Sequence, residues 1–326
     1  MNRRRLAINL LAGLGVAGGT AALLGEGLAG QPTAPDFGHA GPWINIDEPT
    51  RLPTLRGRLT LVNFWTYSCI NVLRTLPYLR RWHSDYAAAG LQIVGIHTPE
   101  FGFEARHPNV EKAVRDLGIL YPVAQDNAYR TWRAWNNRAW PSFHVVDQAG
   151  RIVLLREGEG HASELEASIR QRLGLPPLLA ARMPPDDADL SRIRSPELYF
   201  GAGHPTPQEA VQRPRPGEAS YTFSAAGPRL NRYELEGHWE RREESLLLRS
   251  TGGGLRLHFS AAKAHLVAEA PPSTTVRVRS GTGAWRDITV GFPALYTVVD
   301  GADYADQVME LVADSAGLAL YSATFG

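Results

Sequence analysis

The side chain most capable of chemistry in this sequence is Cys69, the single cysteine of the chain. It follows an apolar run at 61–65 that is typical of a buried strand, and it opens a helical pattern. A helix N-terminus offers unpaired backbone N–H groups and a partial positive charge, which stabilise a thiolate. Free cysteine has a pKa of about 8.5, and such positions can lower it to about 3.5–7.5. The pattern therefore predicts a nucleophile that needs no neighbouring base.

A second interpretation of Cys69 is structural, because a lone cysteine is often a small buried apolar residue. One cysteine forms no internal disulfide and no cysteine-built zinc site. The ten histidines are scattered without a metal-binding spacing. We therefore expect no metal and no cofactor.

Strand and helix patterns alternate through residues 42–175, which predicts an α/β domain. Pro77 lies inside the helix after Cys69 and is expected to kink it. Residues 43–58 predict a lead-in hairpin, and the turn at 147–150 predicts a second hairpin. Strands are expected at 59–65, 91–97, 121–124, within 140–146 and at 151–157, and further helices at 109–117, 129–135 and 162–173.

The spacing of Trp65, Cys69 and Pro77 resembles the W-x-x-x-C…P arrangement of the thioredoxin superfamily. The longer string W-T-Y-S-C-I-N-V-L-R-T-L-P is similar to the extracytoplasmic part of DipZ-type thiol-disulfide proteins, where the motif is C-x-x-C. Val72 takes the place of the second cysteine. Since valine cannot resolve a mixed disulfide, Cys69 would need an outside thiol to recover from a mixed disulfide or a sulfenic acid.

The resemblance also implies roles for residues around the thiol. Pro141, at the start of a strand, would be a cis-proline opposite Cys69 that offers backbone to a bound partner, and the alternative is an ordinary trans proline. Trp140 would help to position the partner. Trp65 would shield the sulfur.

Two other features near Cys69 leave alternatives open. The segment from Thr66 to Cys69 fits the T-x-x-C part of a peroxiredoxin site, but Val62 stands where a proline should precede it. A loop after the strand at 91–97 carries His97, Glu100 and Glu104 at the carboxyl end of that strand, where α/β proteins place their chemistry. These three residues would either hold the loop or assist the thiol.

Chain length and net charge restrict the number of domains and the kinds of partner. The 326 residues, of which 44% are hydrophobic, suggest two domains. A formal net charge of +1 gives no argument for nucleic acid as a partner.

Residues 1–29 predict an export signal of the twin-arginine type, with arginines at 3–5, an apolar run and a small-x-small site at 27–29. The alternative is an uncleaved membrane anchor. A spacer at 30–41 follows. The sequence therefore predicts an extracytoplasmic protein, periplasmic or secreted.

Residues 176–217 are rich in proline and predict a connector. Residues 218–326 show short alternating strands without helices, which predicts an all-β sandwich. Its ending Y-S-A-T-F-G, and the string S-P-E-L-Y-F-G at 195–201, resemble the DipZ-type C-terminal region, a jelly roll similar to carbohydrate-binding modules. Aromatic residues of a sandwich are either core or a platform for sugar, and the candidates are Tyr233, Trp239, Trp285 and Tyr304.

Two functions remain. The first is an exported redox protein that uses Cys69 alone, forming mixed disulfides with protein or small-molecule thiols, or reducing a peroxide. The second is a non-catalytic protein that binds cell-envelope protein or carbohydrate. The acidity and accessibility of Cys69 distinguish the two.

Overall fold

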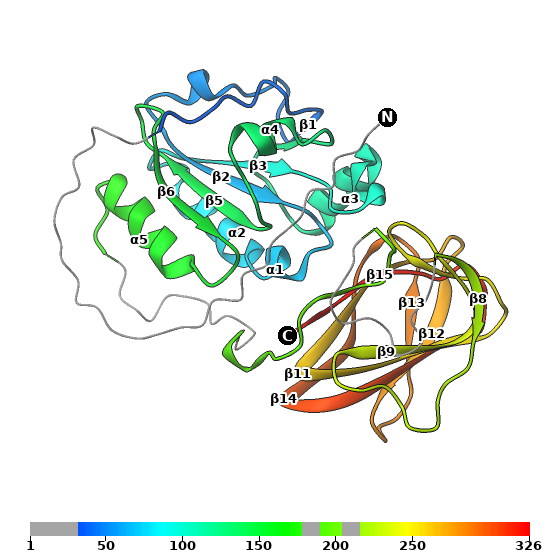
Figure 1. The fold of residues 1–326 in the computed structure, drawn as a ribbon. Coiled ribbons are helices and arrows are strands. Elements are labelled where there is room, and N and C mark those ends of the chain that lie inside the picture. Colours follow the sequence, from blue (N-terminus) through cyan, green and yellow to red (C-terminus); the bar gives the residue numbers. More distant parts are fainter. Residues whose placement is uncertain (1–31, 178–189, 204–215) are drawn as a thin grey trace. The chain divides into compact units, whose positions relative to one another are not determined.

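The computed structural model describes residues 32–177, 190–203 and 216–326, so the expected export signal and much of the connector lie outside the described residues. The first half builds a six-stranded sheet in the order β1-β4-β3-β2-β5-β6 (Figure 1). Its strands are β1 (Trp43–Ile44), β2 (Leu59–Trp65), β3 (Leu91–His97), β4 (Val123–Gln125), β5 (Ser142–Val146) and β6 (Ile152–Glu157). Its helices are α1 (Ile70–Leu73), α2 (Leu76–Tyr86), α3 (His107–Asp116), α4 (Arg130–Ala134) and α5 (Ala162–Arg172).

The centre of this sheet is parallel. Strand β2 pairs in parallel with β3, with Leu59 opposite Leu91 and Trp65 opposite His97. All seven residues of β2 are buried, as continuous apolar strands are when both faces of a sheet are covered. Because parallel strands end at the same edge, the loops that follow Trp65 and His97 lie side by side.

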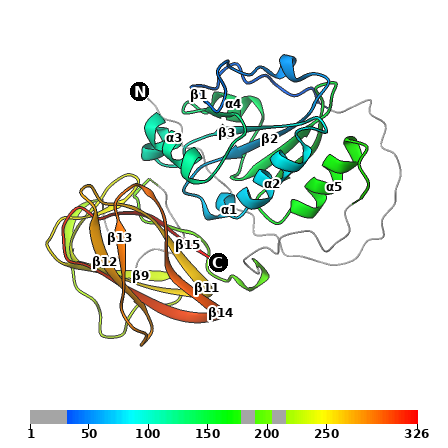
Figure 2. The same ribbon diagram turned by 180° about the vertical axis from the view of Figure 1, so that it is seen from behind.

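Helices cover both faces of the sheet. Residues of α2, α3 and α5 share one apolar core, while Trp132 of α4 belongs to a second core on the other face. Figure 2 shows α2 and α5 side by side. Glu166 of α5 accepts hydrogen bonds from Tyr86 and Arg81 of α2, which ties the two helices together.

Most of the predicted strands and helices are present, and the prediction of a hairpin at 43–58 is wrong. The helix after Cys69 is broken into α1 and α2, and Pro77 is the second residue of α2, where its missing N–H costs nothing. The lead-in hairpin at 43–58 is absent, because Trp43 pairs with Ala124 of β4 and residues 52–55 form a 3₁₀ helix instead. The predicted hairpin of β5 and β6 is confirmed.

The second half is all β, as predicted, with nine strands in one curled sheet. Strand β11 pairs with β14 along its length, but its other neighbour changes from β9 at 254–258 to β15 at 264–269. This exchange lets the sheet fold over its own core. The strands are β7 (Leu198–Tyr199), β8 (Gly217–Tyr221), β9 (Arg232–Arg241), β10 (Leu246–Leu248), β11 (Gly253–Glu269), β12 (Thr274–Ser280), β13 (Arg286–Val290), β14 (Ala294–Ala313) and β15 (Ala319–Phe325).

Residues 32–326 form one compact unit. Tyr321 of β15 packs its ring against Phe101 and Phe103 of the loop after β3, with ring centroids 5.2 and 4.8 Å away. The Gly102 N–H donates to Glu244 at 2.8 Å. The limits at 42–175 and 218–326 stay predictions, but contacts join residues on either side of the connector.

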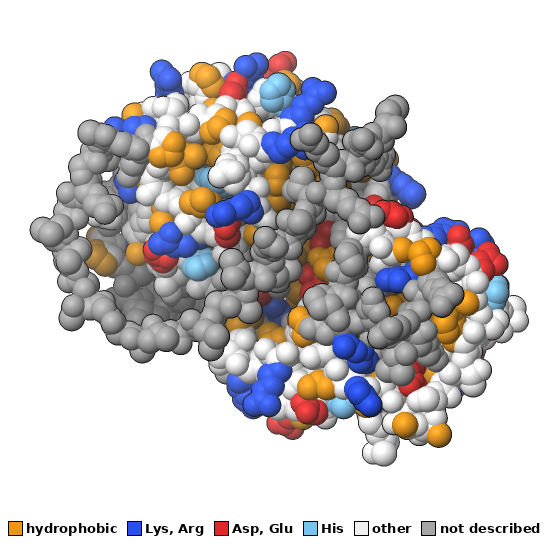
Figure 3. Space-filling view, in the orientation of Figure 1, with side chains coloured by type: hydrophobic (Ala, Val, Ile, Leu, Met, Phe, Trp, Pro, Cys, Tyr) orange, Lys and Arg blue, Asp and Glu red, His pale blue; other side chains and the backbone are white. Residues whose placement is uncertain are grey.

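Two surface properties bear on partners. On the face shown in Figure 3, the positive and negative side chains of the described residues are interspersed. This mixture carries none of the basic striping that nucleic-acid binding requires. No helix in the described part of the chain is long and apolar enough to span a membrane.

Candidate active site

Cys69 lies in the loop after β2 and is the residue that precedes α1. The residue as a whole is half-buried, and the thiol itself is surrounded by protein atoms. Burial raises the pKa of the thiol above its ordinary value, the carboxylates of Glu100 and Glu197 raise it further, and the N–H groups of Val72 and Asn71 oppose this only in part.

The prediction of an acidic thiol is therefore wrong. Helix α1 has only four residues, too few for a sizeable dipole, and its axis ends at Leu73. The stronger influences on Cys69 are desolvation and negative charge from two loops distant in the sequence. The thiol is protonated at neutral pH, and its attack on a partner needs a base.

Glu104 holds the loops on either side of the thiol together. One carboxylate oxygen accepts from the Ser68 hydroxyl at 2.7 Å and from the Ser68 N–H at 3.2 Å. The other accepts from the N–H groups of Glu100 at 2.6 Å and Phe101 at 3.0 Å. Glu104 is fully buried. Of the two roles left open for Glu104, the structure supports the one of holding the loop.

Glu100 has a different environment from Glu104, because its carboxylate accepts a hydrogen bond from the Tyr199 hydroxyl at 2.5 Å. Burial raises the pKa of Glu100, and the charge of Glu197 adds to the rise. Burial raises the pKa of Glu197 to about 7. The charges of both carboxyl groups act on the thiol.

His97 does not take part in this group. It is fully buried, with its ring edge-on to Trp65 at 5.0 Å and stacked on Tyr67 at 5.7 Å between centroids. Burial lowers its pKa to about 3, so the ring is neutral at neutral pH. His97 thus packs between Trp65 and Tyr67, and its neutral ring places no positive charge near the thiol.

The other predicted site residues are partly brought together. Val72 is fully buried in the same apolar core against which Cys69 and Trp140 pack. Trp65 and Thr66 are fully buried at the end of β2. The position that carries a second cysteine in the C-x-x-C motif is therefore filled by an apolar side chain.

The peptide bond between Trp140 and Pro141 is cis, as the resemblance implied. The Pro141 carbonyl accepts from the Gly158 N–H at 2.7 Å. The Trp140 ring packs on Trp132, with centroids 4.5 Å apart. This contact anchors Trp140 on the domain before β5.

Sequence reasoning missed Glu197 and Tyr199 as site residues. The string S-P-E-L-Y-F-G lies inside the expected connector at 176–217, and the sequence shows only its resemblance to DipZ-type proteins. Strand β7 pairs with β15, with Tyr199 opposite Ser322. This pairing carries both residues to the thiol. Nothing in the local pattern signals such a placement.

Of the aromatic residues considered as sugar-binding candidates, two lie in the core and two lie at the surface. Tyr233 and Trp239 are buried in the core of the second half. Trp285 is 38% exposed, and the guanidinium of Arg279 lies over its ring at 4.5 Å. Tyr304 is covered in the same way by Arg192. In each case an arginine covers one face of the ring.

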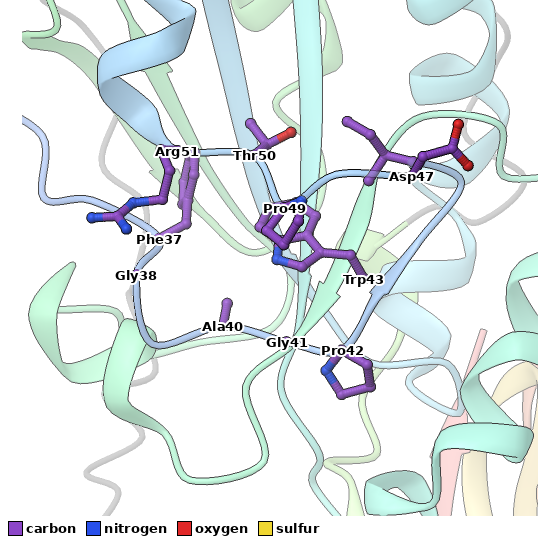
Figure 4. A pocket seen from close by; sticks show the side chains of 11 residues that line it. Phe37, Gly38, Ala40, Gly41, Pro42, Trp43, Asp47, Pro49, Thr50 and Arg51 are labelled. Carbon is purple, nitrogen blue, oxygen red and sulfur yellow. The ribbon is translucent and has the colours of Figure 1, made fainter.

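A shallow cavity of about 450 Å³ lies away from the thiol. Figure 4 shows that its lining comes from one continuous segment, with Phe37, Trp43, Pro49 and Arg51 around the opening. None of the predicted site residues lines this cavity. The thiol is thus the better candidate for chemistry.

The fold and the half-buried Cys69 after the second strand define a thioredoxin-like protein. Comparison with protein families gives the same class: residues 31–154 match the AhpC/TSA family, and residues 195–326 match the thioredoxin-like C-terminal domain. The α/β half of the chain is thus a thioredoxin-like domain, and an all-β domain follows it.

Among curated proteins, the chain resembles Protein DipZ of Mycobacterium tuberculosis and of Mycobacterium bovis. Each is 33% identical over 305 residues, which cover 90% of this chain and 43% of the relative. The chain thus spans less than half of their length. It is also 23% identical to the thiol-disulfide oxidoreductase YkuV of Bacillus subtilis, over 40% of this chain and 87% of that one.

Among solved structures, one similar chain comes from Chlorobium tepidum. The putative thiol:disulfide interchange protein DsbE from Chlorobium tepidum is 23% identical and superimposes with a TM-score of 0.40, covering 45% of this chain and 100% of that chain.

Proposed function

We propose that this chain is an extracytoplasmic thiol-disulfide exchange protein that works through Cys69 alone. The observation that carries the proposal is the half-buried Cys69 in the loop between β2 and α1, with Val72 filling the place of a second thiol. The relatives that carry thiol-disulfide oxidoreductase names support this chemistry. The pattern of residues 1–29 supports export.

The raised pKa of Cys69 sets the direction of the exchange. In a mixed disulfide, the sulfur with the lower pKa leaves more readily. Cys69 is the poorer leaving group, because burial and two carboxylates oppose its thiolate. An incoming thiol therefore expels the partner first. Cys69 acts as a reductant of disulfides, and it stays in a mixed disulfide, now with the incoming thiol, until a further thiol attacks the sulfur of that other half and releases the Cys69 thiol.

The proposal is tested with the full chain and bis(2-hydroxyethyl) disulfide, followed by intact-mass spectrometry. We expect a single adduct of one hydroxyethylthio group, and its removal when excess glutathione is added. The Cys69→Ser variant should form no adduct. If the wild-type chain forms an adduct only after denaturation, the thiol is a structural residue and the proposal fails.

Export is tested separately by fractionating cells that express the full chain with and without residues 1–29. We expect the full chain outside the cytoplasm and the shortened one inside. Equal distribution of the two chains would contradict an export role for this segment. The exchange chemistry at Cys69 would be unaffected by that result.

A further inference from the structure

The all-β half contacts the chain on both sides of the thiol, and the proposed exchange reaction gives this contact no role. Tyr67, which precedes Cys69 by two residues, stacks on Phe292 between β13 and β14, with ring centroids 6.0 Å apart and ring planes 26° apart. Arg74, which follows α1, donates a hydrogen bond to the Phe325 carbonyl of β15 at 2.9 Å. The second half is thus in contact with the residues that lead into and out of the thiol loop.

Both contacts lie close to the residue that bears the sulfur, because little chain separates them from it. Two residues of chain span at most about 7 Å. From Cys69 to Arg74 the chain is helical, with a rise of about 1.5 Å per residue. The Cα atoms of Tyr67 and Arg74 therefore lie within about 9 Å of the Cys69 Cα.

The neighbouring loop, which follows β3, is held by the second half as well. The Tyr199 hydroxyl donates to the Glu100 carboxylate at 2.5 Å, and the Gly102 N–H donates to the Glu244 carboxylate at 2.8 Å. Since β2 and β3 are parallel neighbours, this loop and the thiol loop lie at the same edge of the sheet. The second half therefore contacts both loops at the edge where the thiol lies.

The two halves also share an apolar core. Val267 and Tyr321 of the second half belong to the same buried cluster as residues of β2 and α2, and Phe292 packs against this cluster, as Cys69 does. Close packing of this kind leaves no room for another molecule on the surface that it covers. A partner that needs this surface must first displace the second half.

We propose that the all-β half makes Cys69 selective for small disulfides over protein disulfides, and that Phe292 and Glu244 are the residues that set this selectivity. The inference rests on the proposed function and names its substrate class. A small disulfide needs room only for its own atoms, whereas a typical protein partner covers about 800 Å² of surface, a patch with a radius of about 16 Å. Centred on Cys69, such a patch includes Tyr67 and Arg74, which the second half already contacts.

The chemical step is the same for both kinds of substrate and needs no added oxidant or reductant. The Cys69 thiol loses its proton to solvent, and its sulfur bonds one sulfur of a disulfide R–S–S–R′. The original S–S bond breaks, and R′–S leaves with the electron pair and takes up a proton. Cys69 is oxidised to a mixed disulfide with R–S, while R′–S is reduced to a thiol. Only the access of the disulfide to Cys69 differs.

Two disulfides of different size test the proposal in the full chain at neutral pH. Bis(2-hydroxyethyl) disulfide is the small one and the interchain disulfide of insulin is the protein one, and mass spectrometry follows the adduct on Cys69. The quantity measured is the ratio of the rate constant for the small disulfide to that for insulin. Both rate constants contain the same thiolate fraction, so a change in the pKa of Cys69 cancels in the ratio.

The wild-type ratio should exceed, by tenfold or more, the ratio measured with free glutathione as the attacking thiol. In Phe292→Ala we expect the ratio to fall about tenfold, because loss of the ring releases the contact on Tyr67 and insulin gains access. A tenfold change corresponds to about 1.4 kcal/mol, which lies within the range of a single aromatic pair.

Phe223→Ala is the matched control for Phe292→Ala. Phe223 is also a half-buried residue of the second half, and Arg256 lies over its ring at 4.2 Å, much as Lys112 lies over the Phe292 ring at 5.1 Å. Arg256 belongs to β11, so the control removes the same ring and the same kind of cation contact within the second half. It should leave the ratio unchanged.

Glu244→Ala is a second variant, which removes the hydrogen bond to Gly102 without taking an apolar side chain from the core. It should lower the ratio about threefold. Glu243→Ala is its control, because Glu243 is an exposed neighbour with the same charge, and it should leave the ratio unchanged.

A wild-type ratio equal to that of glutathione would overturn the selectivity and leave exchange at Cys69 in place. So would an unchanged ratio in Phe292→Ala, or a fall of equal size in Phe223→Ala. If circular dichroism shows that Phe292→Ala is unfolded, an unchanged ratio in Glu244→Ala overturns the proposal by itself. A folded wild-type chain that forms no adduct with either disulfide would instead refute the proposed function, and the selectivity with it.

Discussion

Replacing Glu104 with alanine should destabilise the loops beside the thiol. The carboxylate accepts four hydrogen bonds, and two of its backbone donors belong to the fully buried Ser68 and Phe101. A buried donor left without a partner costs about 1–3 kcal/mol. Two such donors give about 2–6 kcal/mol, and removing a carboxyl whose pKa is raised by burial recovers part of it. We expect a net loss of about 3 kcal/mol.

This loss is large against a typical domain stability of about 5–15 kcal/mol. Urea denaturation followed by circular dichroism gives the free energy of unfolding, and hydrogen exchange with mass spectrometry gives the protection of the peptides covering 66–69 and 97–105. Both should fall in Glu104→Ala. Glu111→Ala, an exposed site, should change stability by less than about 0.5 kcal/mol. A loss below about 1 kcal/mol with unchanged exchange would refute the assignment of Glu104 as the residue that holds these loops.

Three further predictions follow from single side chains. The pKa of Glu197 is raised from 4.5 to about 7, so the folded state binds more protons than the unfolded state. The free energy of unfolding should therefore fall by up to about 3 kcal/mol as pH rises between about 4.5 and 7. Glu197→Gln should flatten this dependence in urea titrations at several pH values, and an unchanged slope would contradict the raised pKa. Gly201→Ala should lower the melting temperature by several degrees, because its Cβ would lie 2.4 Å from the Glu243 carbonyl oxygen; a melting temperature equal to wild type would disprove the clash. In Val72→Cys, the new thiol should attack the mixed disulfide at Cys69, form an internal disulfide and release the partner without an added thiol. An adduct that persists in the mass spectrum would contradict this prediction.

Most strands and helices of the thioredoxin-like half could be predicted from the sequence. The strands at 59–65 and 91–97 have the predicted limits, because continuous apolar runs mark strands that are buried on both faces. Pro141 was expected to be cis from the resemblance, and it is. The hairpin expected at 43–58 failed because the partner of β1 is β4, which lies far along the chain. Local patterns cannot indicate such a pairing.

The environment of the thiol shows the same limit. A strand, a loop and a helix start around Cys69 predicted a low pKa, since only local dipoles were in view. The charges that decide the pKa come from Glu100 and from Glu197, and β7 reaches the site through its pairing with β15. The electrostatic potential at a site depends on tertiary contacts. Composition and spacing therefore predicted a nucleophile at Cys69 but gave the shift of its pKa the wrong direction.

The most direct test of the account is the pH dependence of the alkylation rate of Cys69 by iodoacetamide in the folded chain, with mass spectrometry to identify the adduct. We predict a midpoint above the ordinary value of about 8.5, and a lower midpoint in Glu197→Gln. A midpoint below about 8.5 in the wild-type chain would contradict the account, because burial and the charges of Glu100 and Glu197 would then not raise the pKa of the thiol.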